Sequence, residues 1–154
     1  MDIKIVHLEE PNKIAGFSVE TTLENNSQDL DLLYNDFLHN GKREILNNIT
    51  KNNREYYGVI WYTILHKKYK YLLGQKVVSK INGEKMDIKI IPEGKYCKSK
   101  FPVKYDGIKV WTDFYSLDIP QTGYKPKEID DIAFEYYPNG FDGEFELWSL
   151  VEKE

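Results

Sequence analysis

Polar and apolar positions alternate along two segments near the start of the chain, residues 3–8 and 13–22. In the second segment, small and apolar side chains share one side with Phe17, and polar side chains share the other with Ser18. A period of two is typical of a strand with one buried face, and the intervening Pro11 favours a turn. We therefore expect two strands joined as a hairpin.

Apolar positions recur every three or four residues in two later segments, which predicts two main helices. The first set comprises Leu30, Leu33, Tyr34, Phe37 and Leu38. We expect Ser27 or Asp29 to cap this helix and Gly41 to stop it, with a short helical turn and a loop over residues 42–54. The second set, within residues 107–117, comprises Ile108, Val110, Trp111, Phe114 and Leu117. The stretch 120–126 then predicts a loop.

Five further segments have the composition of strands. Residues 56–65 carry β-branched and aromatic side chains on both faces, which is typical of a central strand. Residues 69–79 are expected to return beside it. Strands are also expected at 96–101, 133–137 and 144–151.

The sequence Met86-Asp87-Ile88-Lys89-Ile90-Ile91 repeats the pattern of Met1-Asp2-Ile3-Lys4-Ile5-Val6. Each half of the chain then reads as strand, strand, helix, strand, strand. We interpret this order as an internal repeat, about 1–80 and 86–151, within a single domain, 1–154. Two such units predict an α+β fold, in which an antiparallel sheet carries helices on one side.

Composition narrows the class of protein. The 154 residues, 41% of them hydrophobic, suffice for one core, and the net charge of −4 comes from acids and bases that are mixed along the chain. Because no basic patch forms, we expect no direct nucleic-acid binding. Cys97 is the single cysteine, and no apolar run is long enough to span a membrane. We therefore expect a cytoplasmic protein without disulfides or a membrane partner.

Glu135 is the most informative polar residue, because it stands within the otherwise apolar and aromatic strand Ile132–Tyr137. If its face of the strand is buried, a carboxylate lies among aromatic rings and must be hydrogen-bonded or paired. A flat cation would supply the opposite charge and stack on the rings, at about 0.5 to 2 kcal/mol for each contact. The other interpretation places Glu135 on a solvated face of the strand.

Aromatic residues make up 14% of the chain, more than a core of this size requires. Trp61, Trp111 and Tyr96 could each line a ligand site or pack in the core. Metal binding has little support, because the three histidines are His7, His39 and His66, far apart and without a Cys partner at ligand spacing. The chain also has no glycine-rich phosphate loop, so we expect no metal and no cofactor.

Three short segments of the second half carry a resemblance to a known family, and they are Ile91–Tyr96, Gln121–Tyr124 and Phe134–Tyr136. In order and spacing they resemble the GyrI-like effector-binding domain family, which includes the drug-binding domains of AraC-type and MerR-type bacterial multidrug regulators. Lys13-Ile14-Ala15-Gly16 and Tyr57-Gly58-Val59 extend a weaker resemblance into the first half. The resemblance implies duplicated β-α-β-β units with a ligand groove between the halves.

The resemblance also implies roles for individual residues. Glu135 falls at the glutamate that faces the ligand in this family, where cationic, lipophilic compounds often bind. Trp148 falls where the family tends to carry a pocket tyrosine, and Tyr57 matches an aromatic residue of the first half. The chain departs from the family pattern at Leu150, which replaces a proline, and at residues 117–120, which replace a Trp-Leu-Pro element.

We therefore expect a free-standing binding protein that senses or sequesters a small hydrophobic or cationic molecule, or signals its occupancy to a protein partner. Transcription regulators of the family carry a helix-turn-helix domain ahead of the effector domain, whereas this chain opens with its first strand. A first alternative, implied by the resemblance, is a hydrolase of cyclopropane-bearing genotoxic compounds with Glu135 as general base. A second alternative is inhibition of a topoisomerase through protein contact, as in the founding member of the family.

Overall fold

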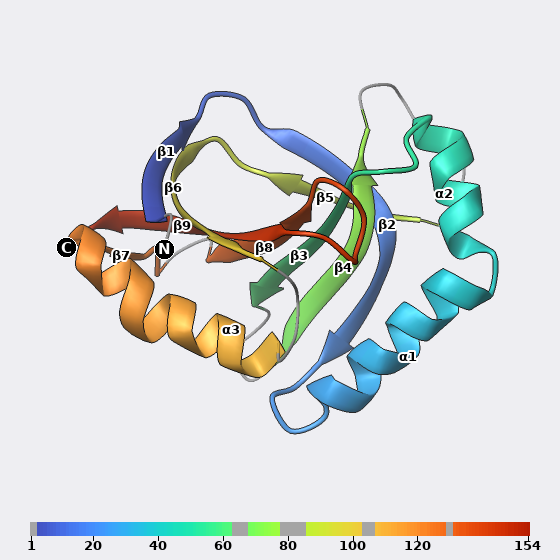
Figure 1. Ribbon diagram of the computed structural model, residues 1–154, viewed down its shortest axis with the longest axis horizontal. Coiled ribbons are helices and arrows are strands. Elements are labelled where there is room, and N and C mark those ends of the chain that lie inside the picture. The colour runs from blue at the N-terminus through green and yellow to red at the C-terminus, as the bar shows by residue number, and fades with distance from the viewer. Residues whose placement is uncertain (1–2, 63–67, 78–85, 103–106, 129–130) are drawn as a thin grey trace.

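The computed structural model describes residues 3–62, 68–77, 86–102, 107–128 and 131–154 (Figure 1). The strands are β1 Ile3–Leu8, β2 Asn12–Thr21, β3 Tyr56–Tyr62, β4 Tyr69–Lys76, β5 Asp87–Ile91, β6 Gly94–Phe101, β7 Tyr124–Pro126, β8 Ile132–Tyr137 and β9 Phe145–Lys153. The helices are α1 Asn26–His39, α2 Lys42–Thr50 and α3 Gly107–Asp113. After α3 the chain continues through a π-helical turn, Phe114–Asp118, and a 3₁₀ turn, Ile119–Thr122.

The strands form one antiparallel sheet in the order β1-β6-β9-β8-β3-β4-β2-β5, with β7 paired to β9. The predicted α+β fold with an antiparallel sheet is confirmed. The order is symmetric: each strand of the first half and its counterpart in the second half lie equally far from the centre, where β3 and β8 pair. The central strand predicted over residues 56–65 is therefore correct for its described part. The internal repeat itself stays a prediction.

The predicted hairpin of the first two strands is wrong. β1 pairs with β6, with Ile5 opposite Cys97, and the two edges of β2 are occupied by β4 and β5. Alternation along a strand indicates which face is buried, but it does not indicate which strand lies beside it. The first strand of each half therefore pairs with a strand of the other half, β1 with β6 and β5 with β2.

Three smaller differences concern the helices and loops. Residues 124–126 form β7 against β9 instead of part of a loop, and α2 has nine residues instead of a single turn. α1 begins after Asn25, which makes no side-chain cap, so neither predicted cap is used. Gly41 does follow the end of α1, and its φ of 84° lets the chain turn at once into α2.

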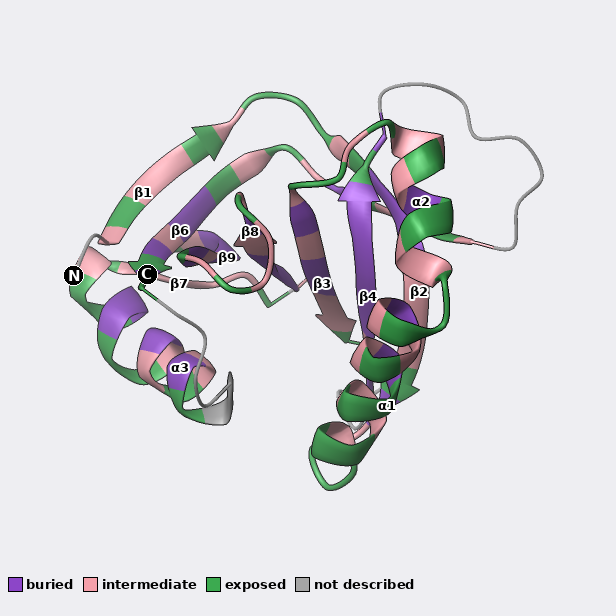
Figure 2. Cartoon of the chain, turned by 45° about the vertical axis from the view of Figure 1, so that its right-hand side comes forward, coloured by how far each residue is buried: buried purple, intermediate pink, exposed green. Residues whose placement is uncertain are grey.

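One face of the sheet carries all three described helices (Figure 2). α1 and α2 lie over β2 and β4, whereas α3 lies on the other side of the sheet centre. The main core forms between these helices and the sheet, and it includes Phe37 of α1, Val110 of α3 and Leu147 of β9. The centre of the sheet therefore lies between α1 and α2 on one side and α3 on the other, and we call these two groups the helical layers.

The opposite face, which we call the helix-free face, has a second core made by the strands themselves. Ile14 of β2, Ile91 of β5 and Tyr96 of β6 are fully buried in one cluster. Because these strands come from both ends of the strand order, the sheet must curl around this face, as the bend of β1 and β6 in Figure 1 shows.

Candidate ligand-binding site around Glu135

Glu135 lies on β8, at the centre of the sheet, and its side chain faces the helices. It is only 4% exposed, so the interpretation that placed it on a solvated face is wrong. Alternation along β8 puts Tyr137 on the same face as Glu135 and Phe134 on the helix-free face. The sheet centre therefore carries a buried carboxylate on the face that the helices cover.

Three neutral groups donate hydrogen bonds to this carboxylate, and a fourth, the Tyr34 hydroxyl, lies nearby. The hydroxyl groups of Tyr71 and Tyr137 donate to Oε1 at 2.6 and 2.7 Å. The Tyr34 hydroxyl lies 3.5 Å from the same oxygen, and Trp111 Nε1–H donates to Oε2 at 3.0 Å. These four side chains come from β4, β8, α1 and α3, so both halves of the chain and both helical layers meet at Glu135.

A further hydrogen bond links Tyr34 to Tyr71, and because Tyr71 donates its hydrogen to Glu135, Tyr34 is the donor. The hydroxyl oxygens of Tyr34 and Tyr71 are 2.5 Å apart, and the two rings lie 6.1 Å apart. Such a network orients each hydroxyl, because a group that accepts one bond is positioned to donate the next. α1 is thereby joined to the centre of the sheet by a polar contact as well as by its apolar stripe.

Gly58 of β3 makes this arrangement sterically feasible. It stands directly opposite Glu135 in the β3–β8 register. A Cβ atom at this position would lie 2.2 Å from the Tyr71 hydroxyl oxygen and 2.6 Å from Glu135 Oε1, closer than atoms can approach. The missing side chain thus provides the space in which Tyr71 reaches the carboxylate.

The tyrosines of the site remain protonated over a wide pH range. Burial raises the pKa of Tyr71 and of Tyr137 well above the usual value of 10.0, and the neighbouring charge of Glu135 raises both further. A protonated hydroxyl is a donor, and donors stabilise the ionised form of a carboxylate. The site therefore surrounds one buried carboxylate with protonated hydroxyl groups and an indole N–H.

The structure brings together only two of the predicted site residues, Glu135 and Trp111. Tyr57 and Trp148 lie on the helix-free face, where Trp148 stacks on Phe134 at 5.2 Å between ring centroids. Trp148 is the direct partner of Phe134 in the register, and successive residues of a strand point to opposite faces. Trp148 therefore points to the same face as Phe134, away from the side chain of Glu135.

The other two predicted residues also lie on the helix-free face. Tyr96 is fully buried there, and its hydroxyl donates to the Pro92 carbonyl at 2.6 Å. Trp61 packs against the same core, and Lys89 Nζ lies 4.7 Å from its ring centroid. Both side chains therefore belong to the second core, on the face opposite Glu135.

Sequence reasoning missed the three tyrosines around the carboxylate. Tyr137 could have been found, because it stands two residues after Glu135 and so shares its strand face. Tyr71 and Tyr34 could not be found in this way. They reach Glu135 only through the sheet order and the packing of α1, which no local pattern encodes.

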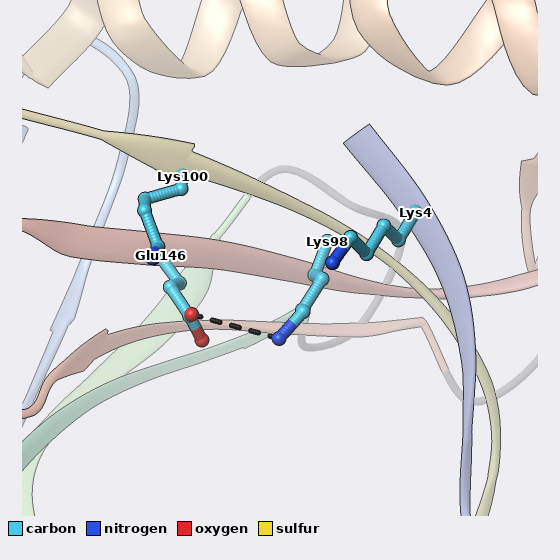
Figure 3. Close-up of a pocket in the computed structure, with 4 residues that line it drawn as sticks. All are labelled: Lys4, Lys98, Lys100 and Glu146. Atoms are coloured by element: carbon cyan, nitrogen blue, oxygen red, sulfur yellow. Dashed lines mark ion pairs between the residues drawn. The ribbon is translucent and has the colours of Figure 1, made fainter. Parts of the chain in front are cut away.

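A small hollow on the helix-free face is a different feature. Figure 3 shows that it is lined by Lys4, Lys98, Lys100 and Glu146, with Lys98 paired to Glu146 at 3.6 Å. Its volume of about 60 Å³ is well below the several hundred Å³ that drug-sized ligands occupy. Its lysine-rich lining also does not suit a cation, so we do not assign the expected ligand to it.

Neither a metal site nor a membrane-spanning helix occurs in the part of the chain that the structure describes. No three His, Cys, Asp or Glu side chains gather there to hold a metal ion. The described helices are also too short or too polar to cross a bilayer. His66, one of the three histidines considered from the sequence, lies outside the described residues.

Comparison with solved structures shows that the fold is shared. SAV2435, in a structure bound to tetraphenylphosphonium, aligns with 15% identity and a TM-score of 0.75, over 99% of this chain and 94% of that chain. An integron cassette protein from Vibrio cholerae aligns with 16% identity and a TM-score of 0.69, over 97% and 95%. The C-terminal domain of EcmrR aligns with 10% identity and a TM-score of 0.61, over 99% and 98%.

Comparison at the level of sequence gives the family. A search of curated proteins found no match. The family model of the Cass2 integron-associated effector-binding protein matches residues 4–149, nearly the whole chain. The resemblance to GyrI-like effector-binding domains is thereby confirmed, and this chain belongs to the family of integron-associated effector-binding proteins.

Proposed function

We propose that this protein binds a hydrophobic cation between its helical layers, with Glu135 as the counter-charge. The observation that carries the proposal is a carboxylate that is 4% exposed and accepts hydrogen bonds from two tyrosine hydroxyls and one indole N–H. The family binds effectors, and its structural relative SAV2435 has been seen with tetraphenylphosphonium, a hydrophobic cation. Both findings support this class of ligand.

Physical chemistry favours a cation at this position over a neutral molecule. A carboxylate withdrawn from water loses solvation, and a neighbouring positive charge restores part of it. The rings of Tyr34, Tyr71 and Trp111 add cation–π attraction of about 0.5 to 2 kcal/mol for each well-placed contact. A hydrophobic cation gains from both effects and also buries its own apolar surface.

Two ions of nearly equal size and opposite charge test the proposal directly. We expect tetraphenylphosphonium to bind and tetraphenylborate to bind much more weakly, as measured by isothermal titration calorimetry. Glu135→Gln should weaken tetraphenylphosphonium binding by about 1 to 3 kcal/mol, because one charged contact is lost. Glu146→Gln, on the helix-free face, is the matched control and should leave the affinity unchanged. Equal binding of the two ions would refute the role given to Glu135.

The hydrolase alternative has less support. A general base needs a lone pair that can reach the proton it abstracts, whereas both oxygens of Glu135 already accept hydrogen bonds from Tyr71, Tyr137 and Trp111. The effector-binding family also favours binding over catalysis. Inhibition of a topoisomerase, and a protein partner in general, stay untested hypotheses.

A further inference from the structure

Trp111 stands out among the groups around Glu135 because it both touches the carboxylate and lies on the outside of the site. The four side chains around the carboxylate differ in burial. Tyr71 and Tyr137 come from the sheet and are buried, whereas Tyr34 and Trp111 come from the helices and are half-buried. Tyr34 and Trp111 are therefore the members of this set that reach solvent.

Tyr34 is held in place by several contacts. Its hydroxyl bonds to that of Tyr71 and lies close to Glu135, and its ring meets Phe141 edge-on at 5.7 Å. Displacing Tyr34 would break a polar network and an aromatic contact together. Tyr34 is thus a poor candidate for the group that moves aside.

The contacts of Trp111 are arranged differently. Its ring stacks on Tyr115 at 5.7 Å and meets Phe114 edge-on at 5.9 Å, and both partners belong to the same helical segment. Val110 and Phe114 hold this segment in the main core, so the indole can leave only by rotation of its own side chain. The hydrogen bond from Nε1–H to Glu135 Oε2 instead joins the indole to the sheet, and the tyrosine donors reach the other oxygen. Withdrawing Trp111 therefore leaves the tyrosine network intact.

The helical segment changes its hydrogen-bonding pattern two residues after Trp111, at the end of α3. α3 ends at Asp113, and Phe114–Asp118 form a π-helical turn. Such wider turns often occur where a helix contributes to a functional site, because they can shift its register.

We infer that Trp111 is an internal plug, whose indole N–H occupies Glu135 until a hydrophobic cation displaces it. This inference rests on the proposed function and specifies how the site is regulated. An indole N–H offers a partial positive charge, and a ligand must offer the carboxylate more to take its place. A full positive charge meets that condition, whereas a neutral apolar molecule does not. Trp111 therefore favours cations over neutral ligands, because only a full positive charge binds the carboxylate more strongly than the indole N–H does.

The variant Trp111→Phe distinguishes an indole that competes with the ligand for Glu135 from one that only lines the binding site. Phenylalanine keeps an aromatic ring but cannot donate a hydrogen bond, so tetraphenylphosphonium has one fewer competitor. We expect about tenfold tighter binding by calorimetry, the order of one hydrogen bond to a charged group. Trp61→Phe removes an indole from the helix-free face and should leave the affinity unchanged. Unchanged or weaker binding to Trp111→Phe would make the indole a wall and overturn the plug.

Fluorescence gives a second measurement. The double variant Trp61→Phe, Trp148→Phe retains Trp111 as its single tryptophan. Tetraphenylphosphonium should shift its emission to longer wavelength and increase its quenching by acrylamide, because the indole moves into water. An emission maximum and a quenching constant that do not change would contradict displacement.

The outcomes also separate the plug from the proposed function. If wild-type protein binds the cation through Glu135 and Trp111→Phe binds no tighter, the plug alone fails. If neither wild type nor Trp111→Phe binds it, the proposed function fails and the plug fails with it.

Discussion

Gly58 shows how one missing side chain can make a functional site. The carboxylate of Glu135 and the hydroxyl of Tyr71 meet directly above it, in space that any other residue would fill. Glycine usually weakens a strand interior, and it is often found where another group approaches closely. At this position the close group is the charged centre of the site.

Gly58→Ala should therefore damage both stability and binding. A methyl group at 2.2 Å from the Tyr71 hydroxyl must displace Tyr71 or Glu135, and overpacking of this kind costs about 1 to 3 kcal/mol. Urea unfolding would measure that loss, and tetraphenylphosphonium titration would show weaker binding. Gly143→Ala is the control, because the nearest atom to its added methyl is 3.8 Å away. Equal stability of the two variants would contradict the steric role of Gly58.

α1 contributes to the site through its apolar stripe as well as through Tyr34. Leu33 and Phe37 are buried one turn apart, and the Phe37 ring meets Tyr56 edge-on at 5.9 Å. The helical spacing of these positions is why the sequence predicts α1 well. The stripe fixes the helix on the sheet, and Tyr34 is thereby brought over its centre.

Phe37→Ala tests how far α1 depends on this stripe. Removing a fully buried phenylalanine leaves a cavity, and we expect unfolding free energy to fall by about 3 to 5 kcal/mol. Leu32→Ala on the same helix is the matched control, because Leu32 is 62% exposed and should change stability by less than about 0.5 kcal/mol. Chemical denaturation of both variants measures the difference. Similar losses in the two would mean that α1 does not anchor on the sheet through Phe37.

Across the whole molecule, the buried tyrosines make stability depend on alkaline pH. Burial raises the pKa of Tyr57 to about 12, and raises those of Tyr71 and Tyr137 well above the usual 10.0. In the unfolded chain these groups ionise near pH 10, so above that pH the unfolded state binds fewer protons than the folded state. Their contribution to stability is therefore complete below about pH 10 and is lost as the pH rises toward their folded pKa values.

We expect the melting temperature to fall steeply between about pH 10 and 12, measured by differential scanning fluorimetry. Phenolate absorbance near 295 nm should rise in two stages, first from exposed tyrosines and then, together with unfolding, from buried ones. Tyr137→Phe should flatten the pH dependence, because one group with a raised pKa is removed. A single smooth absorbance rise that is complete before unfolding would contradict this account.

Local patterns in the sequence determined the elements and the general character of the site. The spacing of Leu33 and Phe37 predicts α1, because a helix buries every third or fourth residue whatever lies beneath it. The composition of residues 56–62 predicts a central strand for the same kind of local reason. Glu135 within an aromatic strand indicates a buried charge, and the family resemblance leads to an effector-binding protein.

Only the tertiary structure decided which strands are neighbours and which residues surround Glu135. β1 pairs with β6 instead of β2, and Tyr34 and Tyr71 reach the carboxylate from α1 and β4. The physical reason is that alternation fixes the two faces of a strand but not its partner, and a hydrogen bond between distant residues depends on every pairing in between. Trp148 and Tyr57 illustrate the same limit, because a shift of one residue along a strand moves a side chain to the opposite face of the sheet.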